Sequence, residues 1–409
     1  MSQSPASHLS ADVLIVGGGL VGGTMACAFA QSGISCIVVD HEDPATAVTE
    51  EFDGRCSAIA LAPQRVLDAV GLWPLMAPGC QPILEIRVSD GHSPLFLHYD
   101  HKALGEAPFG WLAENRLMRK AIFHRIPELP LCTHLAPAKV ATLERDPSGV
   151  RALLADGRTV SARLAVAADG RGSPTRTGAG IGITFSDYHQ TGIVCTVAHE
   201  RPHRGIAQEH FLPAGPFAIL PITGNRSSIV WTEKSHLAPA ILRADEATFM
   251  AELRERFGEF LGEIHVVGPR FGYPLSIQFA DRYTATRLAL IGDAAHGMHP
   301  IAGQGMNMGL RDVAALAEVV VEAKRLGLDP GSAQVLERYT RWRRFDNMLM
   351  LGLTDALNRL FSNDLGPLRL ARDLGLAAVN RMPPLKKVFM RHAMGLVGEL
   401  PRLMRGEAL

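Results

Sequence analysis

The stretch DVLIVGGGLVGGTMACAFAQSGISCIVVD, residues 12–40, decides the fold of this chain. Its apolar residues 13–16 indicate a buried parallel strand. Gly17, Gly19 and Gly22 then match the pattern G-x-G-x-x-G. In that pattern the first glycine permits a tight turn, the second lets the backbone approach a pyrophosphate, and the third lets the next helix pack closely on the strand. The stretch therefore predicts a dinucleotide-binding strand–helix–strand unit.

The residues after the glycines complete this unit. A helix that begins near Leu20 would direct its free N–H groups and the positive end of its dipole at the anion. Residues 37–39 are the predicted second strand, and Asp40 follows at its tip. Asp40 comes 23 residues after Gly17, near the roughly 20-residue offset of a carboxylate that binds a ribose. An acid at this position favours FAD or NAD over NADP.

Length, charge and cysteine content exclude several classes of protein. With 409 residues the chain can bury a large core, and we expect two lobes. Lys plus Arg and Asp plus Glu both number 41, so no overall charge attracts nucleic acid. The six cysteines form no C-x-x-C pair, which argues against a disulfide reductase and a zinc site, and reduced thiols fit a cytoplasmic protein. We expect no signal peptide and no membrane-spanning helix.

The predicted fold class is α/β. A Rossmann-like nucleotide-binding domain would comprise residues 1–82, 110–180 and 283–335. A mostly antiparallel β-sheet domain for substrate, residues 83–109 and 181–282, would be inserted into it, and residues 336–409 would form a helical C-terminal region. Helices are predicted at 62–70, 114–125, 247–257 and 306–325, and further strands at 83–89, 95–99, 140–144, 150–155, 159–161, 164–168, 193–198, 206–212, 217–221, 227–232 and 288–291.

Two later motifs repeat the arrangement of a short acid and glycines after a buried strand. They read AADGRGSPTR, residues 167–176, and GDAAHGMHPIAGQGMN, residues 292–307. In an open α/β sheet the ends of such strands border the crevice that binds ligands. Gly303, Gln304 and Gly305 open the long predicted helix, whose first N–H groups can face an electron-rich ring. Pro174 is compatible with the start of a helix.

The three motifs, in this order and spacing, resemble those of the FAD-dependent aromatic hydroxylases, which are flavoprotein monooxygenases. Within that family, DGRCSAIAL (53–61), ENRLMRKAI (114–122), YPLSIQFADRY (273–283) and RLARDLGLAAVNRMPPLKK (369–387) resemble the ubiquinone-biosynthesis hydroxylases. The resemblance implies bound FAD, transient NAD(P)H or a partner electron donor, and O2. It implies hydroxylation of the ring of a polyprenylated phenol through a flavin C4a-hydroperoxide, so that the chemistry is borne by the flavin and no catalytic side chain or metal is expected.

The resemblance also implies which residues hold the FAD. Gly17, Gly19, Leu20, Val21 and Gly22 would surround the pyrophosphate, Asp40 would bind the adenosine ribose, Arg55 and Arg116 the phosphates or the adenosine half, Asp169 and Gly170 the flavin and the passing NAD(P)H, Asp293 the ribityl chain, and Pro300, Gly303, Gln304, Gly305, Met306 and Asn307 the isoalloxazine.

A few histidines and a tyrosine have the chemistry for other roles. His296 and His299 could be taken for a metal pair, but no third ligand is near them in sequence, so packing is the better interpretation. Tyr188, His189 and His210 could assist deprotonation of a phenol, but each is better explained as a structural residue of the second domain.

Residues 338–409 carry 13 Lys plus Arg and 6 Asp plus Glu among many apolar residues. This basic, apolar region is a candidate surface for anionic lipid or a ubiquinone-biosynthesis complex, which would place a cytoplasmic protein peripherally on the inner membrane. The alternative is that these residues only close the core. Three other functions stay open at this point: hydroxylation of a small soluble aromatic compound, a plain NAD-dependent dehydrogenase, and a non-catalytic flavin-binding scaffold.

Overall fold

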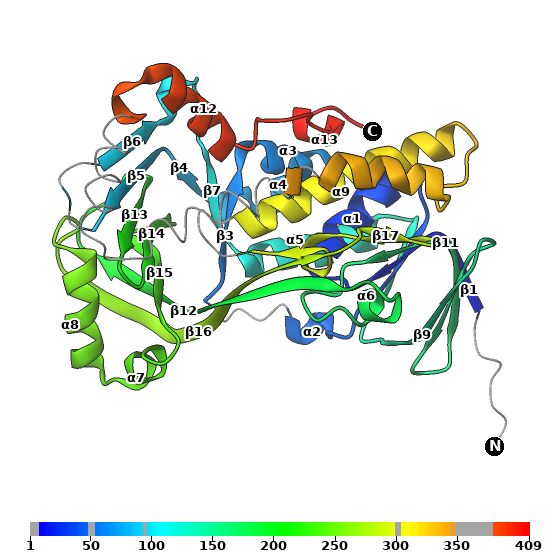
Figure 1. Cartoon of the computed structure of the whole chain (residues 1–409), viewed down its shortest axis with the longest axis horizontal. Coiled ribbons are helices and arrows are strands. Elements are labelled where there is room, and N and C mark those ends of the chain that lie inside the picture. The colour runs from blue at the N-terminus through cyan, green and yellow to red at the C-terminus, as the bar shows by residue number, and fades with distance from the viewer. Residues whose placement is uncertain are drawn as a thin grey trace.

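The computed structural model describes residues 8–47, 54–91, 93, 96–298, 304–344, 346–347 and 379–409. One eight-stranded sheet carries the glycine motifs (Figure 1). Its centre is parallel: β1 (His8–Val16) lies between β2 (Cys36–Val39) and β11 (Thr159–Ala167). The remaining strands are β8 (Cys132–Leu135) beside β2, β18 (Leu288–Leu290) beside β11, β17 (Thr284–Ala285), β9 (Val140–Arg145) and β10 (Val150–Leu154).

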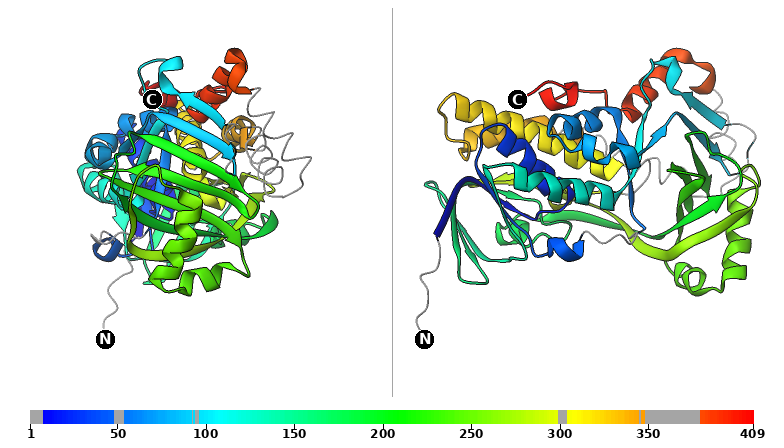
Figure 2. Two further views of the ribbon diagram at one scale, coloured as in Figure 1. Left: turned by 90° about the vertical axis from the view of Figure 1, so that its left-hand side faces the viewer. Right: turned by 180° about the vertical axis from the view of Figure 1, so that it is seen from behind.

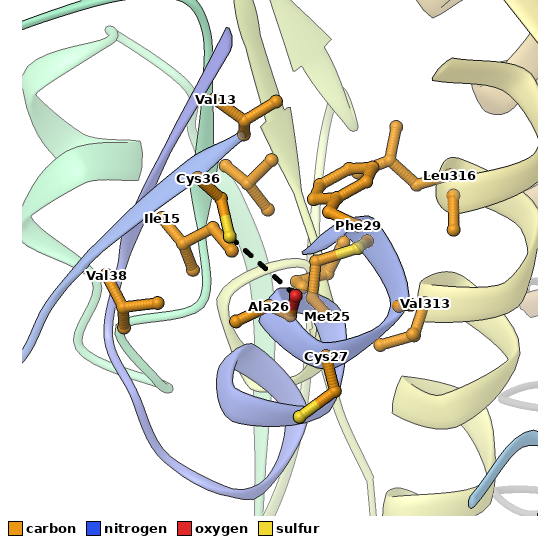
Figure 3. Packing of buried hydrophobic residues seen from close by; sticks show 14 of the residues in the cluster. Val13, Ile15, Met25, Ala26, Cys27, Phe29, Cys36, Val38, Val313 and Leu316 are labelled. Atoms are coloured by element: carbon orange, nitrogen blue, oxygen red, sulfur yellow. Dashed lines mark hydrogen bonds between the residues drawn. The ribbon is translucent and has the colours of Figure 1, made fainter. Parts of the chain in front are cut away.

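Helices cover this sheet and bury a large apolar core. Figure 3 shows α1 (Leu20–Gln31) packed between the first strands and α9 (Gln304–Arg325). Phe29 of α1 is fully buried there, as are Cys27 and Cys36, whose thiols pack as small apolar groups. The other helices of this half are α2 (Pro44–Ala47), α3 (Leu61–Ala69), α4 (Trp73–Met76), α5 (Asn115–Arg125) and α6 (Pro174–Gly178), and residues 333–344 are also helical.

A second eight-stranded sheet lies beside the first and is mostly antiparallel. Its order is β19-β16-β12-β15-β14-β13-β5-β6, with only the β5–β13 pair parallel among the pairs described. Two strands of 17 residues each, β12 (Ile183–His199) and β16 (Ile264–Ala280), reach from the first half of the molecule into the second (Figure 1). The others are β5 (Glu85–Asp90), β6 (Phe96–Asp100), β13 (Ile206–Leu212), β14 (Gly215–Ile222), β15 (Arg226–Lys234) and β19 (His296–Gly297).

Smaller elements join the two sheets. The helices α7 (Ala238–Arg243) and α8 (Glu246–Phe257) cover the second sheet, where Trp231 packs against Phe217 and Phe249. A three-stranded sheet of β3 (Cys56–Ala60), β7 (Gly110–Glu114) and β4 (Gln81–Ile83) stands between the two large ones. After the undescribed residues 348–378 the chain forms α12 (Pro383–Ala393) and α13 (Arg402–Arg405).

The predicted α/β class with a second, mostly antiparallel sheet and C-terminal helices is confirmed. Some of the predicted elements differ in detail from those of the structure. The strands predicted at 159–161 and 164–168 form the single strand β11. The strand β16 is absent from the sequence prediction, because Gly268, Pro269, Gly272 and Pro274 interrupt its apolar pattern. Of the helices in the described ranges, none combines the length and apolar character required to cross a bilayer.

Candidate active site

Two positions of the first motif admit only glycine. Gly17 has φ +99°, and a Cβ on it would lie 2.5 Å from the carbonyl oxygen of Ala168. A Cβ on Gly22 would lie 2.0 Å from the carbonyl oxygen of Gly17. Gly19 differs, because a Cβ there would meet no heavy atom within 4 Å. Gly17 therefore permits the tight turn after the strand, and Gly22 permits the close contact between strand and helix. Gly19 leaves open space at the N-terminus of α1.

Asp40 is nearly buried at the end of β2 and holds the glycine turn. Its Oδ2 accepts a hydrogen bond from the backbone N–H of Gly18 at 2.5 Å, and its Oδ1 accepts one from Glu42 N–H at 2.9 Å. The carboxylate thus fixes the turn to β2 through charge-assisted hydrogen bonds. The sequence analysis predicted a ribose contact for Asp40 and missed this second, structural task.

The three motifs meet at one cleft of about 380 Å³. Space at Gly19 and at Gly305, where an added Cβ would meet no heavy atom within 4 Å, lets a ligand approach the backbone. The first turn of α1 has no side-chain cap, so its N–H groups remain for an anion. These features fit an extended dinucleotide. The residues that line the cleft are Gly19, Leu20, Val21, Cys56, Ser57, Ala168, Gly170, Arg171, Ile291, Asp293, Met298, Gly305 and Met306.

In the second motif, Gly170 lines the cleft while Asp169 supports it from behind. Both carboxylate oxygens of Asp169 are occupied: Ser173 Oγ donates to Oδ1, and the N–H of Thr175 donates to Oδ2 at 3.0 Å. Ser173 caps α6, and Pro174 is the first residue of that helix, a position with which proline is compatible. Asp169 is not among the residues lining the cleft.

Two arginines of the second motif, which the sequence analysis did not single out, join it to the third. Arg171 Nη1 donates to Ser276 Oγ of β16 at 2.7 Å, and its Nε lies 3.7 Å from Asp293 Oδ2. Arg176 is buried, and its Nη1 donates to the carbonyl oxygen of Ala294 at 3.0 Å. In the sequence the two arginines could be noticed because they lie close together in one short motif. The several N–H donors of each guanidinium group allow it to hold neighbouring loops together.

The third motif is anchored to α9 by the fully buried Asp312. Its Oδ2 accepts from Gly292 N–H at 3.0 Å and lies 2.5 Å from His296 Nε2, and its Oδ1 accepts from Arg343 Nε at 2.8 Å. Burial by itself would raise the pKa of Asp312, but His296 and Arg343 outweigh it and lower the pKa to about 2. His296 is thus bound to a carboxylate, and the described residues contain no cluster suited to a metal ion.

Arg55 and Arg116 lie together at the start of α5 but do not line the cleft. The N–H of Asn115 donates to the carbonyl oxygen of Arg55 at 2.9 Å. Arg116 Nε lies 2.5 Å from Glu114 Oε2, and Arg55 Nε donates to Tyr273 Oη at 3.3 Å. The structure therefore brings the backbones of Arg55 and Arg116 close to one another, while their side chains bond to Tyr273 and Glu114.

A second cavity, of about 170 Å³, adjoins the N-terminus of α9. Asn307 is held against β3, since its Oδ1 accepts from Ala60 N–H at 3.0 Å and its Nδ2 donates to Ala58 O at 2.9 Å. Gln304 and Asn307 both line this cavity, whose other walls come from β3, β7 and the second sheet. Its lining is mainly apolar, and it includes one carboxyl group, that of Glu209. Pro300 and Gly303 lie outside the described residues.

Comparison with known proteins agrees with this geometry. Residues 10–347 match the family described as FAD binding domain. The chain is 62% identical to "Ubiquinone hydroxylase UbiL" of Rhodospirillum rubrum, over 98% of this chain and 94% of that protein. It is 34% identical to "3-demethoxyubiquinol 3-hydroxylase" of Escherichia coli, over 94% of this chain and 98% of that protein.

The chain belongs to this family of FAD-dependent hydroxylases. It is an FAD-dependent monooxygenase, with FAD as its cofactor and NAD(P)H as the reductant typical of the family, which sets aside the plain dehydrogenase. The p-nitrophenol 4-monooxygenase PnpA of Pseudomonas putida DLL-E4 shares the fold, with a TM-score of 0.79, 20% sequence identity, and coverage of 96% of this chain and 99% of that one.

The buried cluster around Asp312 yields a test of stability. Asp312→Ala leaves His296 buried without its carboxylate partner and removes one of the two carboxylates that pair with the buried Arg343. The free energy of unfolding should therefore fall by about 3–5 kcal/mol at pH 7. Because the pKa of Asp312 is depressed to about 2 from 3.8, its contribution is complete above pH 3.8 and is lost as the pH falls towards 2. Denaturant titration of the FAD-loaded variant measures the loss. The exposed Asp281→Ala is the control, and equal stability of the two variants would contradict the prediction.

Proposed function

We propose that this monooxygenase hydroxylates the aromatic ring of a polyprenylated phenol in ubiquinone biosynthesis. The observation that carries the proposal is the mainly apolar cavity that shares Gln304 and Asn307 with the start of α9. An apolar cavity suits a ring with a hydrocarbon substituent. The names of the relatives from Rhodospirillum rubrum and Escherichia coli support the same substrate class.

The proposed cofactor contacts follow the cleft. FAD would be held by Gly17, Gly19, Leu20, Val21 and Gly22 at its pyrophosphate, by Asp40 at the adenosine ribose, by Arg55 and Arg116 at the phosphates or adenosine half, by Asp293 at the ribityl chain, and by Gly170, Gln304, Gly305, Met306 and Asn307 near the ring, with Asp169 supporting Gly170. When bound, the flavin takes electrons from NAD(P)H and supplies an electrophilic oxygen from O2. The protein chain binds and orients the flavin and the substrate and excludes water from the site.

The division into domains also stays our proposal. Residues 1–82, 110–180 and 283–335 would bind FAD, residues 83–109 and 181–282 would bind substrate, and residues 336–409 would form the C-terminal region. The sheet order supports it, because β1, β2, β11 and β18 share one sheet while β12 to β16 share the other.

Gly305→Leu tests the cofactor contacts. A Cβ added here meets no heavy atom within 4 Å, and a leucine side chain would extend into the cleft. The variant should therefore fold and bind FAD at least tenfold more weakly, a cost of about 1.4 kcal/mol. Titration of the apoprotein with FAD, followed by flavin fluorescence, measures the affinity. Gly178→Leu is the control, because Gly178 also has open space around it but lies outside the cleft. If both variants bind FAD as the wild type does, the assignment of Gly305 is wrong.

The function itself is tested by mass spectrometry of quinone intermediates in a strain that lacks the gene. We expect a prenylated phenol that lacks one ring oxygen to accumulate, and the purified FAD-loaded enzyme to convert it with NAD(P)H or a partner reductant. A normal quinone pool in the deletion strain would reject the proposal and favour the alternative, hydroxylation of a small soluble aromatic compound. Bound FAD without any quinone defect in Asp293 or Gly305 variants would favour a scaffold.

We also propose that α12 contacts an anionic membrane surface, which a prenylated substrate would favour. One face of the helix exposes apolar side chains: Val388 is 57% and Phe389 40% exposed, with Leu385 beside them. Residues 379–396 contain four Lys or Arg and no Asp or Glu. The opposite face buries Met390 and Met394 in the apolar cluster that includes cavity residues such as Phe109. Figure 2 shows α12 at the rim of the molecule.

Replacing the exposed apolar pair tests this contact. Val388→Asp with Phe389→Asp should reduce binding to phosphatidylglycerol vesicles at least tenfold, because it removes apolar burial and adds like charge to that of the lipid, at a cost of ~1.4 kcal/mol or more. Vesicle sedimentation of the FAD-loaded enzyme measures it, and added salt should weaken wild-type binding. Leu326→Asp, at an apolar residue 73% exposed elsewhere, is the control. Unchanged vesicle binding by the double variant would reject α12 as the membrane contact.

A further inference from the structure

Glu209 is a carboxyl group on the wall of an otherwise mainly apolar cavity. It lies on β13, where it pairs with Val88 of β5 and Ala218 of β14, and Ala218 pairs in turn with Val230. Side chains that pair directly across strands share one face of a sheet. Ala218 and Val230 line the same cavity as Glu209, so the glutamate stands in an apolar row that faces the space beside Gln304 and Asn307.

The carboxyl group makes no hydrogen bond or ion pair with any residue in the described ranges. Its side chain retains some accessible surface because it faces the cavity. Burial raises the pKa of Glu209 to about 7. A second polar atom on this wall, Thr232 Oγ1, is also buried without a hydrogen-bond partner among the described residues. Such groups are costly to bury unless a ligand completes them.

We propose that the Glu209 carboxylate accepts the hydrogen bond of the substrate's phenolic hydroxyl and takes its proton while the ring is oxygenated. This assignment makes Glu209 a catalytic residue and rests on the proposed function. The hydroxyl of Thr232 provides a further polar contact on the same wall.

The proton transfer balances with the reaction of the family. The phenolic O–H bond breaks, its proton forms an O–H bond on Glu209, and the electron pair left on oxygen raises the electron density of the ring. The ring carbon then bonds the oxygen that FAD and O2 supply, which leaves a carbonyl where the hydroxyl was. When that carbon releases its hydrogen as a proton to solvent, Glu209 returns its own proton to the carbonyl oxygen, and the dihydroxylated ring is aromatic again.

Few other ionisable groups face Glu209. Cys56 of β3 is the other ionisable side chain among the described residues lining the cavity. Asp90 lies further along β5 on the same face as Val88. The cavity residues of β14, β15 and α9 are not ionisable, and from α12 the lining residue is Ala393, next to His392. An ionisation near pH 7 that disappears with Glu209 is therefore assigned to this carboxyl group.

The test compares FAD-loaded wild-type enzyme with Glu209→Gln, and uses the exposed Glu263→Gln as control. The substrate is 2-geranylphenol, and the product formed per NAD(P)H oxidised is measured from pH 5 to 9. For the wild type, kcat/KM should rise with pH through about 7, because the carboxylate is the active form. Glu209→Gln should lose about 10²–10⁴-fold in kcat and lose this ionisation, while flavin reduction by NAD(P)H stays unchanged. Activity within threefold of wild type with the same pH profile would overturn the inference.

Thermal stability separates catalysis from a structural role. A carboxyl group whose pKa is raised on folding destabilises the folded state progressively above its ordinary value of 4.5. Glu209→Gln should therefore melt at the same temperature as wild type at pH 4.5 and at a higher temperature at pH 8, where it is least active. A lower melting temperature at both pH values would mean that Glu209 is structural and would overturn the inference.

If the wild type oxidises no prenylated phenol, the proposed function fails on its own, and binding then decides the role of Glu209. The probes are 2-geranylphenol and its methyl ether, titrated by the change in flavin absorbance. We expect the wild type to bind 2-geranylphenol about tenfold more tightly than its methyl ether, which corresponds to one hydrogen bond of about 1.4 kcal/mol. Glu209→Leu, which removes the acceptor, should bind the two equally. A wild type without this preference would overturn the inference.

Discussion

The fold depends on a contact that is possible only because two residues lack side chains. The carbonyl oxygen of Gly17 lies where a Cβ of Gly22 would stand, so α1 meets the end of β1 at backbone distance. This contact sets the direction of α1. It thereby places Phe29 between the sheet and α9 and leaves the N–H groups beside Gly19 without a side-chain cap. Asp40 then holds the turn through the N–H of Gly18. One steric constraint thus sets both the core and the cleft.

The pattern of apolar residues along the sequence predicted the strands of the parallel core and the helices that follow the glycine motifs. The apolar run at 13–16 and the strand at 37–39 could be found because buried parallel strands are continuously apolar. The long strand β16 could not, because its first half is exposed and interrupted by glycine and proline, and only its pairing with β12 defines it. Register between distant strands is a property of the folded chain and leaves no local pattern.

The residues of the candidate site likewise fall into those that the sequence identified and those that only the structure shows. Glycines and acids at fixed spacing identified the residues of the cleft, among them Gly19, Gly170, Asp293 and Gly305. Residues that support those turns from a distance, such as Asp312, belong to ordinary helical sequence and are recognised only by what they touch. Glu209 is the extreme case. In sequence it is one acid in an alternating strand, and its importance comes from the apolar neighbours that three other strands bring to it.

The long strands β12 and β16 also limit how the two halves of the molecule can move. Each runs from the first half of the molecule into the second, and 14 residue pairs join them, with register shifts between Asp187 and Gln190 and between Val194 and Thr196. Because the paired strands join the two halves directly, a motion that separated the halves would have to break these hydrogen bonds or bend the ladder at its register shifts. Ala393 of α12 lines the cavity, so at this point the wall of the cavity belongs to a helix outside that ladder.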